Sequence, residues 1–223
     1  MRILGRLRRL AEIADGEVIV RDMSENMSHT EGSSSREPQR IPAAGLVRFF
    51  EGLVNKSFWE LWIWDREIAS YVVDLLVRFA RMDALYRFQV PHGRRLETVV
   101  EFLIEVFRAS EADVTSSSLQ YKRDMLQHVG DYTLFMSGIF RSYVERHGFL
   151  GLYLKEGGKA YGDVARLDRI LYRSGAARFE ALASEFERIS GALDYMRKVY
   201  FRPTAERSSY REMLLRLYNF SNN

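Results

Sequence analysis

The chain has no cysteine among its 223 residues, and this absence excludes several kinds of chemistry. Without thiols the protein can form no disulfide, thiolate metal site or cysteine nucleophile, and we expect a reducing, cytoplasmic location. Histidine is scarce as well, with four in the chain, and neither His-Glu-x-x-His nor Glu-x-x-His occurs. Because these patterns place zinc or di-iron ligands on one helix face, the sequence predicts no metal site and no cofactor.

Long apolar runs are also missing. A membrane-spanning helix needs about 18 apolar residues in succession, whereas Phe58–Ala80 is interrupted by six charged residues. Met1–Asp15 is rich in arginine but lacks the continuous apolar core of a secretory signal. We therefore expect a soluble protein with no transmembrane segment.

Lysine is rare, because it supplies only 5 of the 33 basic residues, and the net charge is only +3. The arginines are mostly interleaved with aspartate and glutamate, as on a solvated helix face. A nucleic-acid-binding surface instead gathers its positive charge on one face. The charge pattern therefore argues against nucleic acid as a partner.

Apolar side chains recur through most of the chain with the 3.6-residue period of an α-helix, and aromatic residues make up 13% of the sequence. This pattern predicts an all-α fold, an irregular multi-helix bundle of seven or eight helices. We expect glycines at 130 and at 157–158 to end or interrupt helices. The expected helices are Ala43–Val54, one beginning at Asp65, 96–107, 116–129, 131–143, 149–172, 176–200 and 210–217.

Residues 1–42 differ in composition from residues 43–223, which we expect to form the helical domain. Met1–Ala14 has leucines at helical spacing among arginines and predicts a short basic amphipathic helix. It could dock loosely on the domain or form a frayed tail, or it could anchor the protein to a membrane or a partner. Asp22–Pro42 has little to bury and predicts a disordered linker, so the first 42 residues would form a flexible arm.

Two segments carry the polar residues that we single out as a candidate site. In one interpretation His128 ends a helix, where it meets the negative end of the helix dipole, and Asp131 caps the next helix. In the other, the imidazole of His128 faces the carboxylate of Asp131 beside Tyr132, an arrangement suited to proton transfer or ligand contact. The neighbouring segment would then add two cations and a phenol: Lys155, Lys159 and Tyr161.

The stretch His128–Phe140 reads His-x-Gly-Asp-aromatic-x-Leu-Phe-x-x-Gly-x-Phe. With Gly158–Tyr161 and Leu75–Tyr86, it resembles an uncharacterised family of all-helical bacterial proteins. The resemblance covers roughly Ile68–Ala165 and implies a bacterial helical domain. It transfers no functional residue, because that family has no assigned activity.

Four large aromatic residues lie close together in the sequence. Phe58, Trp59, Trp62 and Trp64 fit either core packing or an exposed surface for a partner protein, since tryptophan is enriched in interface hot spots. We favour a non-enzymatic helical domain that binds a protein partner, a second copy of the chain or a small ligand. The alternatives are an enzyme or ligand-sensing site centred on His128 and Asp131, and a peripheral membrane protein.

Overall fold

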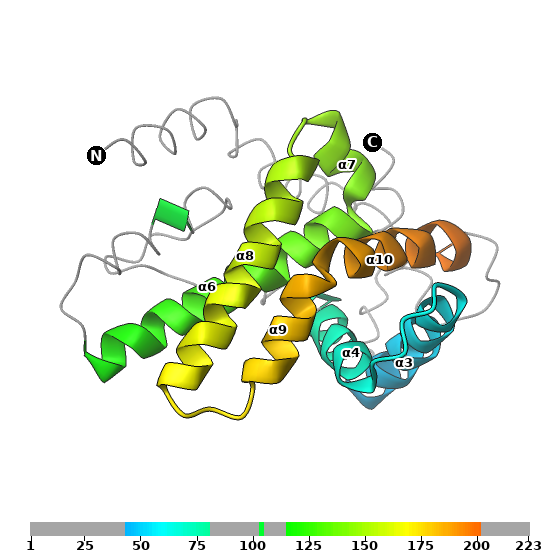
Figure 1. Ribbon diagram of the computed structural model, residues 1–223. Coiled ribbons are helices and arrows are strands. Elements are labelled where there is room, and N and C mark those ends of the chain that lie inside the picture. Colours follow the sequence, from blue (N-terminus) through cyan, green and yellow to red (C-terminus); the bar gives the residue numbers. More distant parts are fainter. Residues whose placement is uncertain (1–42, 81–102, 105–114, 202–223) are drawn as a thin grey trace, which may run out of the picture.

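The computed structural model describes residues 43–80, 103–104 and 115–201, and in this part of the chain every regular element is a helix (Figure 1). The predicted all-α class is therefore confirmed. The predicted arm of residues 1–42, the helix 210–217 and all but two residues of the helix 96–107 lie outside the described residues. The described helices, labelled as in Figure 1, are α3 (Ala43–Glu60), α4 (Arg66–Ala80), α6 (Ser116–Ile139), α7 (Arg141–Arg146), α8 (Leu150–Ile170), α9 (Ala176–Ser184) and α10 (Phe186–Tyr200).

Helix α6 runs without interruption through Gly130, so the predicted break there is wrong. The helix begins with a capping box, in which the Thr115 side chain accepts a hydrogen bond from the Ser118 backbone and the Ser118 side chain accepts one in return. A Cβ added to Gly130 would lie 2.5 Å from Cε1 of Tyr161. The glycine therefore serves close packing rather than termination, and Asp131 lies inside the helix and caps nothing.

Helix α8 also continues through its glycines, contrary to the predicted interruption. A Cβ at Gly157 would collide with the ring of Phe186 and the hydroxyl of Thr133. At Gly138 an added Cβ would lie 2.6 Å from Cβ of Leu193. These glycines thus let α6, α8 and α10 approach one another closely.

The predicted long helix 176–200 is divided at Glu185 into α9 and α10, which point in different directions in Figure 1. Helix α9 packs mainly against α8, whereas α10 packs mainly against α6 and α3. At the bend, Phe186 is buried with its ring 5.8 Å from that of Tyr161. One straight helix could not bury its apolar side chains against both sets of neighbours, so the chain turns.

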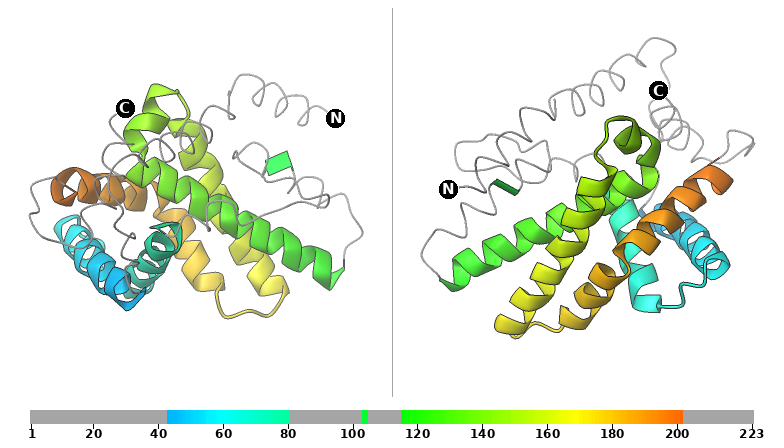
Figure 2. Two further views of the ribbon diagram at one scale, coloured as in Figure 1. Left: turned by 180° about the vertical axis from the view of Figure 1, so that it is seen from behind. Right: turned by 45° about the horizontal axis from the view of Figure 1, so that its top comes forward.

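The second half of α6 forms the centre of the described fold. Every residue from His128 to Phe140 is buried, including the polar ones. Helix α8 packs against α6 (Figure 2), while α3 packs against both α4 and α10. A helix buried around its whole circumference must find partners for its polar side chains inside the protein.

Candidate functional site

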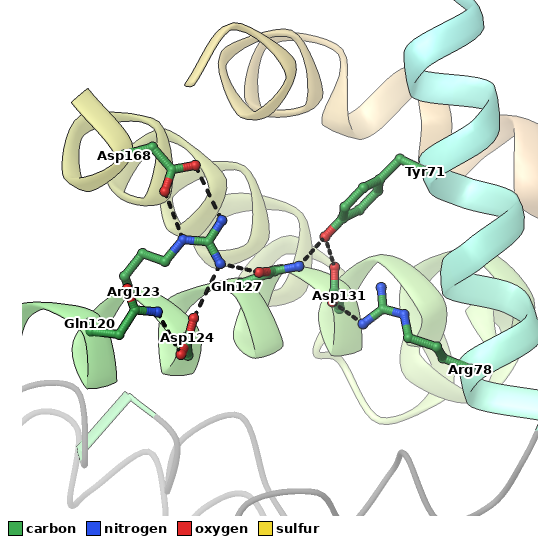
Figure 3. A network of polar contacts seen from close by, with 8 residues as sticks. All are labelled: Tyr71, Arg78, Gln120, Arg123, Asp124, Gln127, Asp131 and Asp168. Carbon is green, nitrogen blue, oxygen red and sulfur yellow. Dashed lines mark hydrogen bonds and ion pairs between the residues drawn. The ribbon is translucent and has the colours of Figure 1, made fainter. Parts of the chain in front are cut away.

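Asp131 lies where α4, α6 and α8 meet, and its side chain is almost completely buried. The hydroxyls of Tyr71 and Tyr161 both donate to Oδ1, at 2.5 and 2.8 Å. Nη1 of Arg78 donates to Oδ2 at 3.0 Å (Figure 3). Both carboxylate oxygens therefore have hydrogen-bonding partners, which removes most of the penalty of burying this group.

The same network continues along α6 to a second buried carboxylate (Figure 3). Nε2 of Gln127 donates to the hydroxyl of Tyr71 at 3.0 Å, and its Oε1 accepts from Nη1 of Arg123. The guanidinium of Arg123 then forms a bidentate pair with Asp168 of α8, at 2.8 and 3.2 Å. An unbroken series of hydrogen bonds therefore joins Asp131 to Asp168.

Aromatic rings and guanidinium groups pack around this network. The ring of Tyr71 meets that of Phe179 edge-on, with centroids 5.5 Å apart. The guanidinium of Arg123 lies 5.1 Å from the centre of the Phe179 ring, and that of Arg178 lies 5.6 Å from both rings. These cation–π contacts add attraction to the ion pairs and help to fix the orientation of the rings.

The surroundings shift the pKa values of the network in one direction. Burial raises the pKa of Asp131, although Arg78 and the two phenols act against that effect. Burial, followed by the neighbouring carboxylate, raises the pKa of both Tyr71 and Tyr161 well above the usual range. The two phenols therefore remain protonated hydrogen-bond donors across the physiological range.

Two of the predicted site residues, Asp131 and Tyr161, are in direct contact. His128 is buried in the middle of α6, where its ring stacks on that of Phe79. The two ring centroids are 6.2 Å apart and the interplanar angle is 17°. Tyr132 is buried between the rings of His128 and Tyr153. Because α6 continues, the interpretation of His128 as a helix-terminal residue is wrong.

The other two predicted residues, Lys155 and Lys159, are exposed on α8. They are one helical turn apart, as the sequence indicated, and they face solvent rather than the buried carboxylate. The structure therefore brings Asp131 and Tyr161 together but leaves the lysines apart from them.

Several residues of the network were not singled out from the sequence. Arg123, Gln127 and Asp131 follow one another at i, i+4 and i+8, so α6 carries a polar stripe on one face. That spacing could have indicated the α6 part of the network. Nothing local indicated the partners that come from other helices, which are Tyr71, Arg78 and Asp168.

A second feature is the group of three tryptophans at the turn between α3 and α4, here named the tryptophan surface: Trp59, Trp62 and Trp64. They are the only tryptophans of the chain, and their exposed fractions are 67%, 71% and 54%. Their rings nevertheless contact one another. The centroid of the Trp64 ring lies 4.5 Å from that of Trp59 and 5.8 Å from that of Trp62, and each pair of rings is nearly perpendicular. Of the four aromatic residues considered together above, only Phe58 belongs to the core.

Backbone contacts hold this turn in place. Ile63 is buried, and its N–H donates to the carbonyl of Phe58 at 2.8 Å. Nη2 of Arg188, on α10, donates to the carbonyls of Leu61 and Trp62 at 3.1 and 2.7 Å. As predicted, Asp65 caps the next helix, since its Oδ1 accepts from two backbone N–H groups of α4. The tryptophans are therefore carried by a fixed segment.

The backbone at Trp62 is left-handed, with φ of 60°. Among the described non-glycine residues, Tyr172 in the α8–α9 turn is the one other with positive φ, at 53°, and it is 98% exposed. A left-handed conformation costs a residue with a side chain about 1–2 kcal/mol. At both positions a large exposed ring occupies a conformation that glycine would adopt more easily.

In comparisons with protein families, with curated proteins and with solved structures, the chain matches none. Within residues 43–80, 103–104 and 115–201, no group of carboxylates and histidines is arranged to hold a metal ion. No helix in these ranges is both long and apolar enough to cross a membrane.

Proposed function

We propose that the protein is a non-enzymatic helical domain that docks a partner protein through the tryptophan surface. The observation that supports this proposal is the exposure of all three tryptophans in one contiguous group. Burying such large rings in the core would stabilise the fold by several kcal/mol, because each can bury about 150–250 Å². Contiguous exposed apolar groups of this kind mark interaction sites, and tryptophan is the residue most enriched in their hot spots.

The way the turn is held also supports docking. Binding costs less entropy when the contacting side chains are ordered beforehand. Here the mutual ring contacts restrict the side chains, while Arg188 and Asp65 fix the backbone on either side. The surface therefore has the preorganised character of a binding site.

The buried network favours a structural role for Asp131, and it therefore supports the proposal that the domain is not an enzyme. Its side chain is 2% exposed and accepts three hydrogen bonds, so a substrate could reach it only after Tyr71 or Arg78 moved away. His128 is likewise enclosed by aromatic rings. The lack of cysteine and the resemblance to bacterial proteins support a place in the bacterial cytoplasm as part of this proposal.

Site-specific photo-cross-linking tests the proposal. The photoreactive residue p-benzoylphenylalanine replaces Trp62 in the full-length chain, which is then irradiated in the cells that produce it. Tyr172 is the matched control position, because it is also an exposed ring at positive φ in a turn between helices. We expect position 62 to capture one defined protein that position 172 does not capture.

That protein, once identified and purified, should bind the wild-type chain and shift its tryptophan fluorescence, which arises only from this surface. Substitution of Trp59 and Trp64 by serine should weaken the binding at least tenfold, as expected for hot-spot side chains. Equal capture at both positions, or binding that survives both substitutions, contradicts the proposal. Capture of a second copy of the same chain also contradicts it.

A further inference from the structure

We infer that the tryptophan surface accepts a positively charged side chain, arginine or lysine, from its partner. This inference rests on the docking function proposed above and specifies the chemistry of the partner. Two observations support it independently: the angles between the rings and the charge of the turn that carries them.

The rings form two nearly perpendicular pairs that share Trp64. The interplanar angle is 87° for Trp59 with Trp64 and 79° for Trp62 with Trp64. Perpendicular indoles create corners in which one cation can lie over one ring face while remaining close to a second ring. Indole gives the strongest cation–π attraction of the natural side chains, and the electron-rich face is the part that attracts.

The turn is also acidic. Between Trp59 and Glu67 the chain carries three carboxylates, those of Glu60, Asp65 and Glu67, against one basic residue, Arg66. The guanidinium of Arg188, which lies beside the turn, is engaged with the two backbone carbonyls and with Glu185. A cationic group that approaches the rings therefore meets an excess of negative charge.

The same charges argue against two other occupants. An anionic lipid surface would be repelled by the net negative charge of the turn. A second copy of the chain, docked face to face, would place like charges opposite one another across a symmetric contact. A basic segment of a different protein is the partner that fits both the rings and the charge.

The test uses the full-length chain labelled with 5-fluorotryptophan, so that each of its three fluorine NMR signals reports on one residue of the surface. The probe is an acetylated, amidated pentapeptide with arginine between two leucines. A matched peptide carries citrulline, the neutral analogue of arginine, and another carries glutamate. We expect the arginine peptide to shift the signals saturably and to bind at least about fivefold more tightly than the citrulline peptide, with the glutamate peptide weakest.

Charge substitution provides a second readout. Asp65→Asn with Glu67→Gln keeps a residue that can cap α4 while removing two charges, and should weaken binding of the arginine peptide about threefold at low salt. The control pair, Glu51→Gln with Glu156→Gln, removes the same charge from α3 and α8 outside the turn and should leave binding unchanged. Equal weakening by both pairs would mean that only the overall charge matters, which overturns the inference.

Other outcomes also overturn it. Equal binding of the arginine and citrulline peptides would show a surface that selects apolar groups. Signals that respond to phosphatidylglycerol vesicles rather than to any peptide would identify a membrane as the occupant, and signals that shift on dilution would identify a second copy. Cross-linking at position 62 separates the two proposals. A captured partner without an arginine preference supports the docking proposal and contradicts the inference of a cationic partner. An arginine preference without a captured partner shows that the rings attract a cation and contradicts the docking proposal.

Discussion

Replacement of Gly130 by alanine tests how α6 and α8 are held together. In an ordinary helix interior this change is favourable, because glycine costs about 1 kcal/mol relative to alanine. Here the new Cβ would lie 2.5 and 2.6 Å from two carbons of the Tyr161 ring, which is completely buried. The ring must therefore move, although its hydroxyl is fixed by the bond to Asp131.

The magnitude follows from three contributions. Helix propensity adds about 1 kcal/mol of stability, overpacking removes about 1–3 kcal/mol, and weakening of the Tyr161–Asp131 bond removes about another 1–3 kcal/mol. We expect a net loss of about 3 kcal/mol. The control is Gly52→Ala on the exposed side of α3, where no atom lies within 4 Å of an added Cβ. There we expect a gain of up to about 1 kcal/mol.

Urea unfolding followed by helical circular dichroism measures both free energies, and a change in midpoint without a change in slope indicates an effect on stability alone. Combining Gly130→Ala with Tyr161→Leu gives the coupling between the two positions, which should exceed about 1 kcal/mol because they are in contact. If Gly130→Ala were as stable as Gly52→Ala, the packing of Tyr161 against α6 would be wrong.

Three further outcomes follow from the structure. Burial raises the pKa of Asp131 above 3.8, so the stabilisation that comes from this shift is fully present below that pH and is lost as pH rises through the raised pKa. In urea unfolding at stepwise pH values, the stability of the wild type relative to Asp131→Asn should therefore decrease as pH rises. A difference that grows with pH would contradict the shift. The pKa values of Tyr71 and Tyr161 are raised as well, so stability should fall above about pH 10, with ultraviolet absorbance showing their ionisation only as the protein unfolds. Tyr172→Gly should raise the unfolding free energy by up to about 1 kcal/mol by removing the left-handed strain, and the reasoning fails if thermal unfolding shows a loss.

The helical class and one helix start could be predicted because they depend on local pattern. The period of the apolar residues is a property of each segment alone, and Asp65 caps the helix that directly follows it. The errors at Gly130 and Gly157 have a different origin. What decides the role of each glycine is a ring from another helix, Tyr161 in one case and Phe186 in the other. Propensity indicates that a glycine weakens a helix, but not that a neighbour compensates for it.

The candidate site could be predicted only in part, for a similar reason. Asp131 and Tyr161 were chosen for their polarity within helical segments, and they do meet. Tyr71 and Arg78 reach Asp131 from 60 and 53 positions away in the sequence, on a helix in which the sequence singled out neither residue. The exposure of the tryptophans was equally undetermined, because a short turn has no periodicity that assigns its side chains to the inside or the outside.

The buried core and the tryptophan surface are connected through α10. On the inner side of that helix, the Ser190 hydroxyl donates to the hydroxyl of Ser137 at 2.9 Å, and Leu193 packs against Gly138, so α10 is fixed to the centre of α6. On its outer side, Arg188 holds the backbone of the turn through the carbonyl of Trp62. The contacts between α6 and α10 therefore help to fix the position of the turn that carries the indole rings.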